Sequence, residues 1–124
     1  MKANELRIGN YINYEQTTHV VIGFDLYGII SYWLNGDDKL DHYRTKIDEV
    51  KPIPLTEEWL LKFGFVLHDD DNFWFYKHGL DFCVTKDKGS FFVWIMDGDF
   101  VEIISVHQLQ NLYFALIRKE LEFN

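Results

Sequence analysis

The stretch PIPLTEEWLLKFGF, residues 52–65, encodes one short helix with a signal at each end. Pro52 and Pro54 interrupt strand pairing, because proline has no backbone N–H and holds the residue before it in an extended conformation. Thr56 is placed to cap the first turn, and Gly64 fits the left-handed position after a last turn. The stretch therefore predicts a helix that begins after Thr56 and ends before Gly64.

A helix of this length is marginal in water by itself. We therefore expect its apolar side chains, Trp59, Leu60 and Phe63, to pack on strands on either side of it in the sequence. We therefore interpret the helix as the connection between two β-rich parts of the chain.

The part before this helix, residues 6–47, contains short apolar runs separated by polar turns. The runs YINY, HVVIGF, YGIISYWL and YRTKI predict three or four strands, with EQTT as the first turn. So few strands need a second layer or a closed shape to bury one face. We expect a small SH3-like barrel or a curled antiparallel sheet, and the pattern leaves both open.

The part after this helix, residues 65–104, has turn signals about every ten residues and predicts an antiparallel meander. A terminal helix follows, in which Ser105 and Gln108 form a capping box. Its expected buried stripe consists of Leu109, Leu112, Tyr113 and Leu116. The fold class is therefore α+β: β segment, short connecting helix, meander and C-terminal helix. We expect one domain over residues 1–124, with lobes 1–51 and 52–124 as the alternative.

The net charge of the chain limits the classes of partner that it can bind. Twenty acidic and twelve basic side chains give a formal charge of −8, which repels phosphate backbones and anionic lipid heads. The single cysteine excludes an internal disulfide and favours a reducing compartment. No apolar run has the length of a signal peptide or a membrane span. We expect a cytoplasmic protein that binds neither nucleic acid nor membrane directly.

No catalytic set is apparent in the sequence. The five histidines lack the spacing of a zinc site, and His68 beside DDD is typical of a solvated turn. Cys83 lies in LDFCVT, where alternation places it opposite Phe82, with no activating neighbour in the sequence. Asp97 and Asp99 flank a glycine at a hairpin tip, which is too mobile for acid–base chemistry. We therefore expect no enzymatic activity, no cofactor and no metal.

The aromatic side chains exceed what one sheet face can bury. The runs FWFY and FFVW put rings on both faces of neighbouring strands. Either a second layer covers both faces, or some rings form an interaction surface. Trp74, Tyr76 and Trp94 are the candidate binding residues for a protein partner or a second copy of the chain.

The terminal helix offers a second candidate site. His107, Gln108, Gln110 and Asn111 give it a neutral polar flank near its amino end, where free backbone amides can meet a small anion. The candidate binding residues there are His107, Gln108 and Asn111. The alternative is a capped helix whose polar side faces water.

Three blocks of the sequence resemble a known group of proteins. LRIGNYI near the start, PIPLTEEWLLKFGF in the middle and VHQLQNLYFAL near the end are similar to small uncharacterised proteins of Bacteroides-type bacteria and their phages or prophages. The resemblance implies a mobile-element or phage origin in a bacterial host. It implies no activity and no catalytic residue, because that family has no established function.

These observations lead to three hypotheses. The first is a non-enzymatic phage or mobile-element accessory protein that acts by protein–protein binding or self-association. The second is capture of a small, nucleotide-like anion between the β segments or at the start of the terminal helix. The third is an acidic DNA-mimic inhibitor, which ranks last because lysines are interspersed among the acids.

Overall fold

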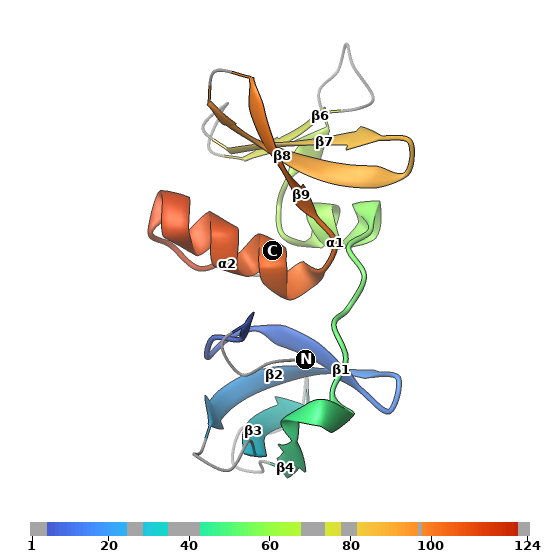
Figure 1. The fold of residues 1–124 in the computed structure, drawn as a ribbon, viewed down its shortest axis with the longest axis vertical. Helices are drawn as coiled ribbons and strands as arrows, with labels where there is room; N and C mark the ends of the chain where they lie inside the picture. Colours follow the sequence, from blue (N-terminus) through green and yellow to red (C-terminus); the bar gives the residue numbers. More distant parts are fainter. Residues whose placement is uncertain are drawn as a thin grey trace. The chain divides into compact units, whose positions relative to one another are not determined.

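The computed structural model describes residues 5–24, 29–34, 43–67, 74–77, 82–96 and 98–121. The described residues form an α+β chain (Figure 1). Contacts divide the chain into two compact units. Unit 1 comprises Met1–Ile53 and Ser105–Asn111, and unit 2 comprises Pro54–Ile104 and Leu112–Asn124. Unit 1 therefore takes in a segment, residues 105–111, that the sequence interpretation assigned to the second lobe.

Unit 1 contains a four-stranded antiparallel sheet in the order β1-β2-β3-β4. Its elements are β1 (Tyr11–Tyr14), β2 (Thr17–Phe24), β3 (Ile29–Leu34), β4 (Tyr43–Lys46) and the 3-10 turn η2 (Ile47–Glu49). All four strands were predicted. The first turn is shorter than the predicted EQTT, because Thr17 already pairs with Tyr14. Glu15 and Gln16 form the whole turn, both with positive φ.

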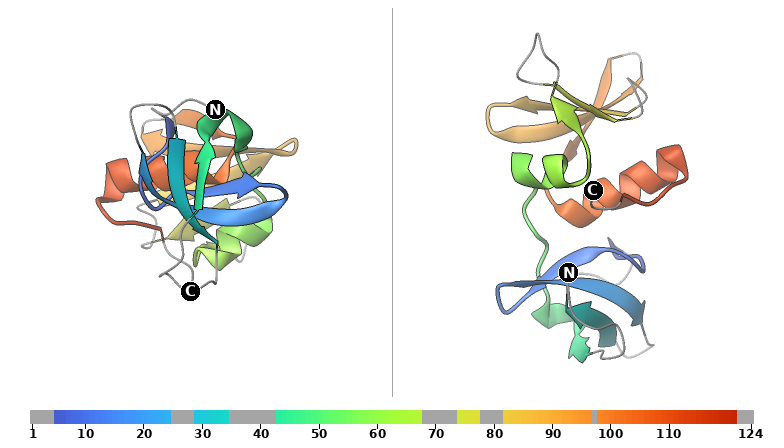
Figure 2. Two further views of the ribbon diagram at one scale, coloured as in Figure 1. Left: turned by 90° about the horizontal axis from the view of Figure 1, so that it is seen from below. Right: turned by 180° about the vertical axis from the view of Figure 1, so that it is seen from behind.

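The sheet of unit 1 curls back on its first strand. After η2, Lys51 forms a bridge with Asn13 of β1, with backbone N–O distances of 2.9 and 2.8 Å. The small buried core of the sheet consists of Leu6, Ile12, Val21 and Val50. The expected curled antiparallel segment is therefore confirmed, and Figure 2 shows its strands from two further sides.

The connecting helix α1 covers Glu57–Lys62, as its two end signals predict. The Thr56 hydroxyl accepts a hydrogen bond of 3.3 Å from the backbone N–H three residues later. At the other end Gly64 has φ 86°, and the next amide, of Phe65, donates to the Leu60 carbonyl at 3.0 Å. This is a Schellman-type end, in which the left-handed glycine lets the chain reverse over the last turn.

Unit 2 contains a five-stranded antiparallel meander in the order β5-β6-β7-β8-β9. Its strands are β5 (Val66–Leu67), β6 (Trp74–Lys77), β7 (Phe82–Asp87), β8 (Ser90–Met96) and β9 (Asp99–Ile103). One face packs on the helical residues of the unit. The Phe82 ring lies 5.0 Å from that of Tyr113 and 5.9 Å from that of Phe65, both edge-on. The predicted meander is confirmed.

The terminal helix α2 covers Val106–Ile117. Of the predicted stripe, Leu109 and Tyr113 are buried, whereas Leu112 is half-buried and Leu116 is 47% exposed. The prediction was wrong for Leu116, because the last turn of the helix does not bury that side. No helix in the described part of the chain combines the length and apolar character needed to cross a bilayer.

Candidate interaction surface

Strand pairing in unit 2 places five aromatic side chains on one face of its sheet. Residues that pair across antiparallel strands point to the same side. One cross-strand row consists of Tyr76, Cys83, Trp94 and Phe100, and the next consists of Trp74, Thr85, Phe92 and Glu102. We call Trp74, Tyr76, Phe92, Trp94 and Phe100 the aromatic face. It holds all three aromatic residues that the sequence proposed as binding residues.

The opposite face of this sheet forms the core of unit 2. Phe75, Val84 and Val93 share that face and are almost completely buried. Lys77 also lies there, and its ammonium group donates to the Phe63 carbonyl at 2.7 Å. Figure 1 shows α1 on one side of the sheet. The helical residues of the unit thus cover one face, and the aromatic face is the other.

The rings of the aromatic face remain partly open to solvent. Trp94 is 40% exposed and Phe100 is 46% exposed, while Trp74, Tyr76 and Phe92 are half-buried. The rings of Trp74 and Phe100 lie 6.2 Å apart at 45°, although β7 and β8 separate their strands. These two side chains therefore reach toward each other across the face. Exposed aromatic rings that contact one another are typical of protein interaction surfaces.

Cys83 lies within the first row, between Tyr76 and Trp94. It is on the face opposite Phe82, as alternation predicted, and it is buried. A nucleophilic thiol must be reachable by its substrate. The position of Cys83 therefore fits packing beneath the aromatic rings.

The charges on the two faces of the sheet differ in sign. Glu102 lies on the aromatic face, and alternation along β7 puts the exposed Asp87 on the same side. Lys86 lies on the core face, where its ammonium group is 3.0 Å from the Glu57 carboxylate. Lys77 also lies on the core face, and Lys88 is in the β7–β8 turn. Among the described strand residues, the aromatic face thus carries carboxylates and no lysine or arginine.

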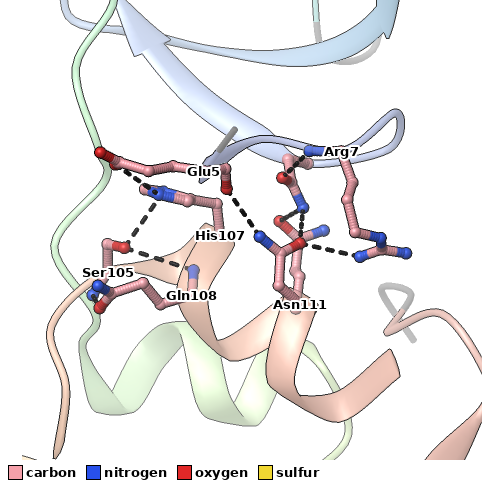
Figure 3. A network of polar contacts seen from close by, with 8 residues as sticks. Glu5, Arg7, Ser105, His107, Gln108 and Asn111 are labelled. Carbon is pink, nitrogen blue, oxygen red and sulfur yellow. Dashed lines mark hydrogen bonds and ion pairs between the residues drawn. The ribbon is translucent and has the colours of Figure 1, made fainter. Parts of the chain in front are cut away.

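The other predicted site residues belong to a polar network in unit 1 (Figure 3). Ser105 and Gln108 form the predicted capping box, with distances of 3.2 and 3.4 Å. His107 is buried, with Nδ1 at 3.2 Å from the Ser105 hydroxyl and Nε2 at 3.9 Å from the Glu5 carboxylate. Burial lowers the pKa of His107 below its ordinary value of 6.5, and the charge of Glu5 opposes that shift.

Asn111 binds the segment that leads into β1. Its side-chain oxygen accepts from the Arg7 guanidinium at 2.9 Å and from the Asn10 amide at 2.8 Å. Its amide group donates to the Glu5 carbonyl at 2.8 Å. Figure 3 shows these contacts beside those of His107. The polar flank predicted for the terminal helix is thus engaged within unit 1.

Gln110, which the sequence placed on the polar flank of the terminal helix, is instead a buried member of this network. It is 1% exposed, accepts from the Tyr11 amide at 2.8 Å and donates to the Gly9 carbonyl at 3.0 Å. A signal was present in the sequence, since position 110 follows Val106 by four residues and precedes Tyr113 by three. A polar side chain within a buried stripe indicates a specific buried partner.

Two backbone amides at the start of α2 are already bonded inside unit 1. The Val106 amide donates to the Ile53 carbonyl at 2.8 Å, and the Gln108 amide donates to the Ser105 hydroxyl. An anion at this helix end would have to displace those bonds. The geometry thus favours a structural role for this helix end, which holds segments of unit 1 together, over binding of a ligand.

Unit 1 also has a shallow hollow of about 340 Å³ next to β4. Its lining residues are Tyr14, Arg44, Thr45, Lys46 and Glu49. Two cations and one carboxylate meet there beside an aromatic ring. Its volume is at the lower end of the range for small-molecule sites.

The remaining sequence candidates form no site in the described residues. His42, His68, His78 and Asp97 lie outside those residues, and Asp99 is exposed in β9. Within the described ranges, no three His, Cys, Asp or Glu side chains are grouped to hold a metal ion. Comparison with models of protein families, with curated proteins and with solved structures gives no match to this chain.

Proposed function

We propose that this chain is a non-enzymatic accessory protein that binds another protein through the aromatic face. The observation that carries the proposal is the placement of five aromatic rings on the sheet face opposite the core, with Trp94 and Phe100 nearly half exposed. Aromatic residues are enriched among the anchors of protein interfaces, because a ring buries much apolar area at little conformational cost. The resemblance to phage and prophage proteins supports a mobile-element setting in the cytoplasm of a bacterial host.

The test is capture of host proteins by immobilised chain. The double variant Trp94→Ser with Phe100→Ser removes the two most exposed rings of the aromatic face, and the matched control Leu61→Ser removes a 54% exposed apolar side chain from α1. We expect the control to capture the same protein as the unaltered chain, and the double variant to lose it. Equal capture by all three proteins would refute binding through this face.

Self-association is tested on the same variants. Size-exclusion chromatography with light scattering gives the molar mass of the purified chain, which is 14.9 kDa for one copy. A dimer that disappears only in the double variant would make a second copy the partner of the aromatic face. A monomer in every case would leave another protein as the partner.

A small anionic ligand is the second candidate function, and the hollow of unit 1 favours it. Arg44 and Lys46 supply positive charge there, and the Tyr14 ring can stack on a flat group. Thermal shift against nucleotides and inorganic phosphate tests this function. A ligand at a hundred times its dissociation constant would stabilise the chain by about 2.7 kcal/mol, and Arg44→Gln should remove the shift. The DNA-mimic function ranks below both.

A further inference from the structure

The aromatic face combines exposed rings with negative charge, and this combination narrows the chemistry of its partner. Trp94 and Phe100 are the most exposed rings of the aromatic face. Glu102 is the partner of Phe92 in the neighbouring row, and Asp87 lies on the same side. The lysines of the same strands, Lys77 and Lys86, contact carbonyl and carboxylate groups on the core side. A ligand for this face therefore meets π-systems and carboxylates together.

We propose that the aromatic face binds an arginine-containing segment of the partner protein, an inference that rests on the proposed function. A guanidinium group is planar, stays charged and is weakly hydrated, so it stacks on aromatic rings and pairs with carboxylates at the same time. Trp94 offers the best ring for such stacking, and Glu102 lies two residues beyond its partner Phe100 on the neighbouring strand, on the same face. The formal charge of −8 attracts a basic segment from a distance.

Two other occupants of an aromatic sheet fit less well. Single-stranded nucleic acid also stacks on such rings, but its phosphates need a positively charged groove, and the described strand residues of this face supply carboxylates instead. A second copy of the chain would bring Glu102 and Asp87 of one face toward the same carboxylates of the other. Charge complementarity therefore favours a basic protein segment over both.

The experiment uses the full chain and a short peptide of alternating glycine and arginine, measured by isothermal titration calorimetry at ionic strength of about 0.15 M. The variants are Trp94→Leu and Phe100→Leu, which keep an apolar side chain but remove the ring, and Glu102→Gln, which removes one charge. Glu58→Gln is the matched control, since Glu58 is an exposed carboxylate on α1. Circular dichroism confirms that each variant is folded.

We expect Trp94→Leu to weaken peptide binding by about fivefold and Phe100→Leu by about threefold. Glu102→Gln should weaken it by about twofold to fivefold, and Glu58→Gln should leave it unchanged. A peptide with lysine in place of arginine should bind more weakly at equal charge. Equal affinity of the unaltered chain, Trp94→Leu and Phe100→Leu for the arginine peptide would overturn the proposal, as would equal binding of the two peptides.

Absence of arginine-peptide binding, or tighter binding of an oligothymidine than of the peptide, would also overturn it. Failure of this inference is distinguishable from failure of the proposed function. If the peptide does not bind but Trp94→Ser with Phe100→Ser still abolishes capture of a host protein, the face is an interface and only the partner chemistry is wrong. If capture is also unaffected, both proposals fail.

Discussion

Replacement of Gln110 by leucine tests the polar network of unit 1. The side chain is buried, accepts from the Tyr11 amide and donates to the Gly9 carbonyl, so leucine leaves both backbone groups without these partners. An unsatisfied backbone group costs about 1–3 kcal/mol, and both groups are only partly buried, so the loss is about 2–4 kcal/mol. Burial of the leucine side chain offsets about 1 kcal/mol of this. We expect Gln110→Leu to lower the free energy of unfolding by about 2 kcal/mol.

The assay is urea unfolding followed by circular dichroism, with thermal unfolding as the second measure. For a chain of this size, a change of about 2 kcal/mol lowers Tm by roughly 6–10 °C. The control Lys119→Leu introduces leucine at an exposed position after α2 and should change stability by less than about 0.5 kcal/mol. Hydrogen exchange at the Tyr11 amide should accelerate in Gln110→Leu alone. A variant as stable as the unaltered chain, with unchanged exchange, would refute the assigned role of Gln110.

Three further predictions concern the contributions of His107, Thr56 and Gly64 to stability. Because burial lowers the pKa of His107, the unfolded chain binds a proton more readily than the folded chain. The free energy of unfolding should therefore be highest above pH 6.5 and should decrease as the pH falls below that value, and His107→Gln should weaken this pH dependence. Thr56→Ala should reduce unfolding free energy by about 1 kcal/mol in urea titrations, while Thr56→Ser restores most of it; no loss in the alanine variant would contradict the cap. Gly64→Ala should cost about 1 kcal/mol in the same assay, because alanine is strained at φ 86°, and a stabilised variant would argue against the left-handed helix end.

The elements that the sequence predicts best are those encoded by neighbouring residues. Both ends of α1 follow from Thr56 and Gly64, whose partners lie within a few positions. The capping box of α2 is equally local. The strands follow from runs of apolar and β-branched residues, whose alternation does not depend on the identity of the neighbouring strand. These features need no knowledge of the tertiary structure.

The candidate surface was predictable only in part. The excess of rings in β6 and β8 left an exposed set as one of two alternatives, and the face on which Trp74, Tyr76 and Trp94 meet depends on strand register. Register and the side covered by helices are set by contacts between distant residues. Phe100 joined the set only through its pairing with Trp94, and a register shift between Trp94 and Met96 separates that pair from the turn between the two strands. Such irregularities have no clear local signature.

The polar network was the least predictable feature. His107 and Asn111 were expected to face a ligand or water, because their residue types are common on helix surfaces. Their partners, Glu5, Arg7 and Asn10, lie about a hundred positions earlier in the chain. A single sequence does not show which distant segments meet. The role of Gln110 was hidden for the same reason.

The division of the chain has a consequence for the order in which it folds during synthesis. Unit 1 includes residues 105–111, which the ribosome makes only after every strand of unit 2. The segment around Gly9 and Tyr11 therefore waits for Gln110 while residues 54–104 are added, which takes several seconds at roughly 5–20 residues per second. The meander can begin to pair during that interval. The first residues to emerge would thus be among the last to reach their native contacts. An incomplete chain that stops before α2 would lack the contacts of Gln110 with Gly9 and Tyr11.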